Sequence, residues 1–188
     1  MAEDAHVRHL PISLFVGCGL LVGCTRQGPV TEPPSALQPQ ATIREIMDAE
    51  VDPSADALWD SVMITITAAG EDDRQPRTAA EWQAVRRSAI VLIEATNLLV
   101  MPGRRVASDD SPLGPGELTP AAIQQRIDAN RAEFAGFAQA LRGVSIKALA
   151  AIDSKNADAL LNVGSEIDEA CEACHLVYWY PPGAAPKP

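Results

Sequence analysis

Apolar and polar residues alternate along most of this chain with the three- and four-residue spacing of helices that bury one face. The first such stretch opens at Thr42-Ile43-Arg44-Glu45, where the Thr and Glu side chains can satisfy free backbone N–H groups as a capping box. It continues through Met47, is interrupted at Asp52-Pro53 and resumes through Leu58 to Val62. Proline lacks a backbone donor and clashes with the preceding turn, so we expect a kink or break there.

Three further helices are predicted. The second begins at the capping box Thr78 to Glu81 and stops at Pro102-Gly103, the third begins at Thr119-Pro120, and the last begins near Asn156 and ends before Pro181-Pro182. Each has a stripe of core-facing residues: Trp82, Val85, Ala89, Leu92, Thr96 and Leu99; Ile123, Ile127, Phe134, Phe137, Leu141 and Leu149; Leu160, Val163, Ile167, Cys171, Cys174 and Tyr178.

The fold class predicted from these stretches is all-α, an antiparallel four-helix bundle over residues 41–182. Short links join the first helix to the second and the third to the fourth, and a long loop joins the second to the third. A short strand at Ile64 to Thr67, where β-branched residues crowd together, is the one competing element.

The residues before the bundle predict export. The apolar run from Leu10 to Gly23 is too short to span a membrane and suits a secretory signal peptide at residues 1–23. Its end, Leu21-Val22-Gly23-Cys24, resembles a bacterial lipobox, in which Cys24 becomes the lipidated first residue; a plain cleaved signal is the alternative. Residues 24–40 are a Pro-rich tether and residues 183–188 a disordered tail, which predicts a periplasmic protein anchored to a bacterial membrane by lipid.

Cys171-Glu172-Ala173-Cys174-His175 is a C-x-x-C-H motif, which is typical of covalent c-type haem attachment. On one helix turn both thiols and the imidazole share a face, so Cys171 and Cys174 can form the thioethers while His175 binds the iron. A zinc half-site or a thiol redox pair is less favoured, because further ligands and a βαβ pattern are both missing. His6 and His9 leave with the signal peptide, so His175 is the one histidine of the mature chain.

The second axial ligand is sought among the thioethers of Met47, Met63 and Met101. The antiparallel order places Met47 and Met101 at the haem pole, and Met47 shares a stripe with Ile43. We therefore expect Met47 to be the distal ligand, with simple core packing as its alternative. Arg44 and Arg104, with Arg105, are candidate partners for the haem propionates. Tyr178, beside Trp179 and Tyr180, is expected to pack against the haem edge.

A helical pattern that ends in C-x-x-C-H resembles the class II c-type cytochromes, the cytochrome c prime superfamily. The resemblance covers about residues 41–182 and is carried by the motif with Tyr178 to Pro181 and by Ile43 to Met47; Glu81-Trp82 and the segment from Asn97 to Arg104 resemble lipoprotein-type members. It implies one haem cradled at one pole of a bundle, and Met47 matches the low-spin, methionine-ligated members. The resemblance also makes a homodimer one expected oligomeric state of the protein.

The formal net charge of −10 disfavours nucleic-acid binding and favours a redox partner with a basic docking surface, unless the charge serves solubility alone. No nucleophile–base pair or phosphate loop is evident, so we predict an electron carrier rather than an enzyme. Two alternatives remain: a gas-binding or gas-sensing haem protein with an open distal site, and a haem subunit of a larger membrane-side redox enzyme.

Overall fold

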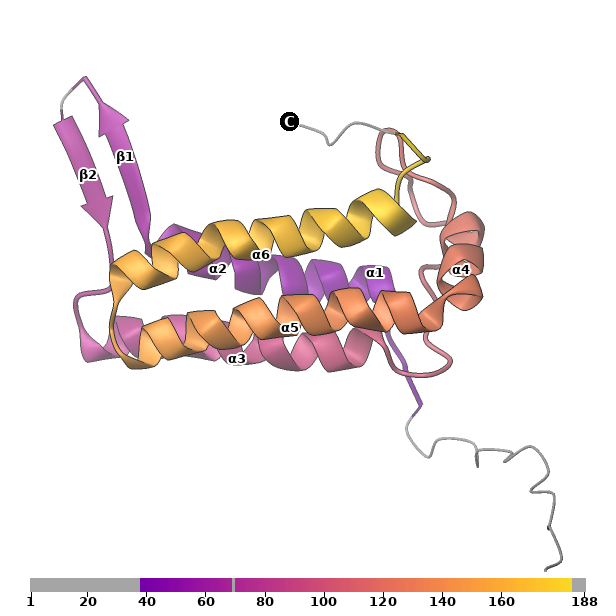
Figure 1. Ribbon diagram of the computed structural model, residues 1–188, viewed down its shortest axis with the longest axis horizontal. Coiled ribbons are helices and arrows are strands. Elements are labelled where there is room, and N and C mark those ends of the chain that lie inside the picture. Colours follow the sequence, from indigo (N-terminus) through magenta and orange to yellow (C-terminus); the bar gives the residue numbers. More distant parts are fainter. Residues whose placement is uncertain (1–37, 69, 184–188) are drawn as a thin grey trace, which may run out of the picture. The chain divides into compact units, whose positions relative to one another are not determined.

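The computed structural model describes residues 38–68 and 70–183. The predicted signal peptide, the expected lipidation site Cys24, most of the predicted tether and the tail after Gly183 lie outside these residues. Helices make up most of the described chain, and the remaining regular structure is one short hairpin (Figure 1). No helix in the described ranges is both long and apolar enough to cross a membrane.

The first helical stretch consists of three consecutive segments: α1 (Ile43–Ile46), the π-helix η1 (Met47–Val51) and α2 (Asp52–Ser61). Thr42 and Glu45 form the predicted capping box at its start. Of the kink or break expected at Pro53, no break in the helical backbone is found: the α-helix is interrupted just before Pro53 by one wide π turn. The N–H of Asp52 bonds to the carbonyl of Met47, five residues back, and Pro53 takes an early position in α2, where its missing donor costs little.

A hairpin follows α2. Strand β1 (Met63–Thr67) contains the suspected strand, and β2 (Gly70–Arg74), which the sequence did not suggest, pairs with it antiparallel. Gly70 has a φ of +127°, a conformation that a residue with a side chain rarely adopts. Figure 1 shows the hairpin projecting from one end of the helices.

Helix α3 (Ala79–Leu99) begins at the predicted capping box of Thr78 and Glu81. The predicted third helix is divided in two, α4 (Pro120–Ala129) and α5 (Arg131–Asp153). The division falls at Asn130, whose backbone leaves the helical region and whose side chain accepts a hydrogen bond from Glu133 N–H as the N-cap of α5. Helix α6 (Ala157–Tyr178) starts after Asn156, as expected.

Four helices lie side by side: α3 packs against α2 and α5, and α6 packs against α5 and α2 (Figure 1). One hydrophobic cluster draws buried residues from all of them and from α1 and α4. Helix α2 approaches α6 very closely at Gly164, whose carbonyl accepts a 3.0 Å hydrogen bond from Trp59 Nε1. A Cβ at Gly164 would lie 3.1 Å from the Trp59 ring, so glycine permits this approach.

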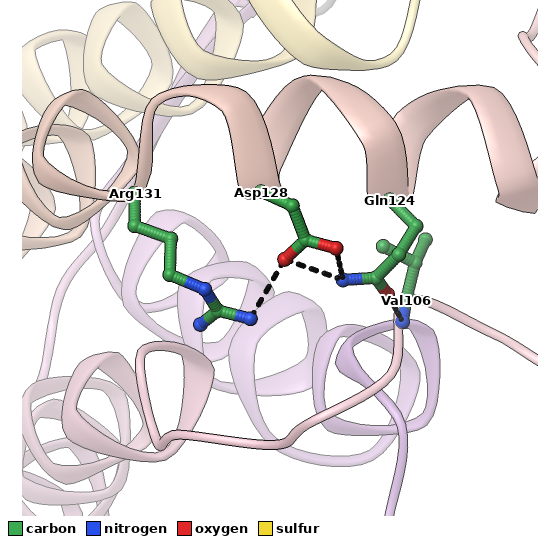
Figure 2. A network of polar contacts seen from close by, with 4 residues as sticks. All are labelled: Val106, Gln124, Asp128 and Arg131. Carbon is green, nitrogen blue, oxygen red and sulfur yellow. Dashed lines mark hydrogen bonds and ion pairs between the residues drawn. The ribbon is translucent and has the colours of Figure 1, made fainter. Parts of the chain in front are cut away.

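The loop between α3 and α4 is bound to the end of the helices where α1 starts. The backbone N–H groups of Ile43 and Arg44 bond to the carbonyls of Arg105 and Val106. Figure 2 shows the other side of this attachment: Gln124 Oε1 accepts from Val106 N–H, and Asp128 accepts from Gln124 and from Arg131. The loop also reaches the end of α6, where the N–H of Leu118 bonds to the carbonyl of Trp179.

Candidate functional site

The last turns of α6 hold the two thiols and the imidazole of the C-x-x-C-H motif. Cys171, Cys174 and His175 all line one cavity, which is predominantly apolar. Its other walls come from η1 and the start of α2, from the end of α3, and from α5 and α6: Met47, Val51 and Asp52; Leu99; Phe134, Phe137, Ala138 and Leu141; and Ala170. We call this space the apolar cavity.

Met47 contributes to the apolar cavity from the side of η1. The π turn explains why Met47, Val51 and Asp52 reach the same space: residue i+5 of a π-helix falls under residue i, whereas in an α-helix it turns away. The sequence therefore predicted Met47 correctly as a residue near the motif, but it did not predict Asp52, which appeared only as part of a helix break.

A second, more polar pocket adjoins the first. Three residues line both spaces, namely Met47, Asp52 and His175. The polar pocket is completed by Arg44, Asp48, Glu117, Trp179 and Tyr180. The rings of His175 and Trp179 lie 5.8 Å apart with their planes tilted by 55°.

Arg44, a predicted propionate partner, lines the polar pocket and makes an ion pair with Glu117, at 2.8 Å between Nη2 and Oε2. Its Nε is buried and has no hydrogen-bond partner. A buried guanidinium N–H without an acceptor is costly, so this donor is available for an anionic group in the pocket. Glu117 was missed because nothing in a sequence links two residues so far apart.

Arg104 does not line either cavity, and the structure gives it a different role from the predicted one. It is buried, and its nitrogens donate to the carbonyls of Leu98 and Ala41 and to Met101 Sδ. Leu98 and Met101 lie at the end of α3, and Ala41 lies just before α1. Arg104 therefore joins these two parts of the chain. Burial lowers the pKa of its guanidinium.

The three methionines considered as ligands have different surroundings in the structure. Met101 Sδ accepts a hydrogen bond from Arg104 Nη2 at 3.3 Å and lines neither cavity. Met63 lies in β1, is exposed and lines neither cavity. Met47 is the one of these three whose side chain shares the apolar cavity with His175.

Tyr178 is buried behind the cavity wall rather than in it. Its ring meets Phe134 and Phe137 edge-on at 5.3 and 6.0 Å, and its hydroxyl donates to the Asn130 carbonyl and to Glu133. Burial, with the nearby Glu133 carboxylate, raises the pKa of Tyr178 to about 12. Tyr178 therefore supports the two phenylalanines that line the cavity, which the sequence had assigned only to the core.

Both thiols are free and partly buried. Burial raises the pKa of each to about 12, and for Cys171 the carboxylates of Asp52, Asp168 and Glu172 add to the effect. A thiol redox pair depends on a lowered pKa, because the thiolate is the nucleophile. Burial therefore favours the protonated thiol form of both cysteines.

No group of three or more His, Cys, Asp and Glu residues that could hold a metal ion occurs within residues 38–68 and 70–183. Comparisons with protein-family models, with curated proteins and with solved structures find no match to the chain.

Proposed function

We propose that the chain is an electron carrier that binds one haem covalently through Cys171 and Cys174, with His175 and Met47 as the two axial ligands. The observation that carries the proposal is the apolar cavity, where Cys171, Cys174, His175 and Met47 line a common space whose other lining residues are mainly apolar. The packing of α2, α3, α5 and α6 agrees with the four-helix bundle of class II c-type cytochromes, to which we assign the chain on this basis.

The residues present suit a haem. Two thiols, an imidazole and a thioether are the donor set of c-type sites with mixed axial ligation. The unpartnered Nε of Arg44, in the polar pocket beside His175, suits one propionate. When bound, the haem supplies a one-electron couple; methionine ligation raises its potential.

The chain's own residues hold and insulate this group. Phe134, Phe137 and Leu141 exclude water from one side of the apolar cavity, while Cys171 and Cys174 fix the position along α6. Met47 comes from a different segment, so its bond to the iron would tie η1 to α6. If His175 and Met47 held the iron in both oxidation states, the reorganisation on electron transfer would be small.

The visible spectrum of the haem-loaded protein tests this function. A low-spin ferric spectrum with the weak sulfur-to-iron charge-transfer band is expected, and Met47→Ala should convert it to a high-spin spectrum that responds at once to carbon monoxide. Met101→Ala is the matched control and should leave the spectrum unchanged. A high-spin, carbon monoxide-reactive parent protein would contradict the carrier and support gas binding instead.

We further propose that the protein is exported and anchored to a membrane by lipid on Cys24, with the tether allowing it to reach a basic redox partner. Labelled fatty acid should be incorporated into the parent chain and not into Cys24→Ser. Purification of the labelled chain in a stable complex with a larger enzyme would instead favour the subunit alternative.

A further inference from the structure

The hairpin of β1 and β2 has no part in the proposed haem site. It forms a two-stranded sheet that projects from the helices (Figure 1). An isolated two-stranded hairpin is marginally stable in water, because neither face is covered. All five residues of β1 are exposed, which is unusual for a strand with the sequence Met-Ile-Thr-Ile-Thr.

The isoleucines of β1 have no apolar neighbour across the hairpin. Ile64 is 48% exposed and stands opposite Asp73, and Ile66 is 81% exposed and stands opposite Glu71. Isoleucine gains most from an aromatic or β-branched residue at the facing position, and the register places an acidic residue there in both cases. The apolar surface of β1 therefore remains available to another strand.

The two outer edges of the hairpin differ in charge. β2 contains Glu71, Asp72 and Asp73, and charged residues are a common device that stops strand addition at a sheet edge. β1 contains no charged residue and four β-branched ones, the composition that favours strand pairing. Addition of a strand is thus directed to the β1 edge.

We propose that this edge pairs with β1 of a second copy of the chain, giving a four-stranded sheet across a two-fold axis. An antiparallel register centred on Thr65 sets Ile64 of each copy opposite Ile66 of the other, so that four isoleucines share one face. This arrangement is self-complementary, as a two-fold interface requires. The acidic β2 strands become the outer edges and end the assembly at two copies.

Charge does not prevent this contact. The two β2 strands would be separated by three strand spacings of about 4.8 Å, roughly 14 Å, which exceeds the screening length of about 8 Å at physiological salt. A groove beside β1, lined by Met63 and Ile64 and by Leu161 of α6, is bordered by Asp168 and Glu169. An uncharged strand such as β1 is compatible with that border, whereas an acidic one is not.

Cysteine cross-linking in the haem-loaded full chain tests the register. Thr65 lies on the proposed two-fold axis, so Thr65→Cys should form a disulfide between copies when copper and oxygen are added; two thiols lose two protons and two electrons to the oxidant. Asp72→Cys is the matched control, because Asp72 stands opposite Thr65 on β2 and is equally exposed. It should give far less dimer, and so should the parent chain.

Ile66→Lys combined with Thr65→Cys should abolish the cross-link, with an unchanged helical circular dichroism signal showing that the chain still folds. Salt gives a second readout: dimer yield should rise from 20 mM to 300 mM, since salt screens the remaining repulsion between acidic copies. Three outcomes would overturn the proposal. These are equal cross-linking at positions 65 and 72, no cross-linking at either position, and a Thr65→Cys variant whose main cross-linked product contains another protein. Cross-linking does not depend on the visible spectrum of the haem. Its result therefore tests the dimer independently of the proposed haem site.

Discussion

Arg44 Nη2 lies 2.8 Å from Glu117 Oε2, although 73 residues separate the two in the chain. Glu117 also accepts the N–H of Gly114, and both side chains of the pair are mostly buried, with 22% and 16% exposed. The pair joins the first turn of the helical region to the end of the long loop, next to the proposed haem site.

This pair should make stability depend on pH in the acid range. Burial by itself would raise the pKa of Glu117, but hydrogen bonds from Arg44 and Gly114 N–H, with the charges of Arg44 and His175, lower it below 4.5. Its contribution is therefore complete above that value and is lost as pH falls through the pKa in the folded protein. Glu117→Gln should reduce the free energy of unfolding by about 1 kcal/mol at pH 7 and by less at pH 3.

Urea unfolding at the two pH values measures this difference. Glu166→Gln is the control, because its ion pair with Lys147 is largely exposed and should contribute little. The same loss for both variants at both pH values would contradict the role of the buried pair.

Arg104 should matter for stability and not for the haem. Arg104→Ala removes the hydrogen bonds to the carbonyls of Ala41 and Leu98 together with the packing of a buried side chain, and we expect a loss of about 2–3 kcal/mol in the free energy of unfolding. Arg104→Lys should recover only part of it, since an ammonium cannot reproduce the planar fork. Denaturant unfolding, with exposed Arg105→Ala as the control, checks the prediction. A larger spectral change in Arg104→Ala than in Arg44→Ala would restore the propionate role to Arg104.

Asp52 should lower the redox potential if the haem assignment is correct. Its carboxylate borders both cavities beside His175, where a negative charge stabilises the ferric form. Burial raises the pKa of Asp52 while His175 opposes that rise. Asp52→Asn should raise the midpoint potential at pH 7 by on the order of tens of millivolts. Asp56→Asn, one turn further along α2 and outside both cavities, should change it much less in the same potentiometric titration.

Two glycine substitutions should have opposite effects. Gly164→Ala places a methyl group against Trp59 and should cost about 1–3 kcal/mol through overpacking. Gly143→Ala lies within α5, where a Cβ meets nothing within 4 Å, and should stabilise the protein by about 0.5–1 kcal/mol. Thermal unfolding of both variants gives the comparison, and similar shifts in the same direction would contradict the close α2–α6 approach.

Local signals in the sequence predicted helix starts well and long-range contacts poorly. The capping boxes at Thr42 and Thr78 satisfy backbone donors within three residues, so their effect is independent of the rest of the fold. The interruption near Pro53 was predicted, but not its form, because the cost of proline depends on whether the preceding turn can widen. Strand β2 was missed because its acidic residues have low strand propensity. Arg44 and Arg104 received the same expected role from the sequence, yet only the folded chain shows that the hydrogen bonds of Arg104 go to other parts of the protein.

The π turn at Met47–Val51 holds one more residue than an α-helical turn would at that place. The extra residue changes the angle about the helix axis between α1 and α2. Each segment can therefore direct its apolar face towards the helices that it packs against. Removing Ala49 would let the segment relax to an uninterrupted α-helix and would rotate Met47 by about 100° relative to α2, since each α-helical residue turns the chain by that angle. The direction in which Met47 points is thus set by the number of residues in this turn as much as by their identity.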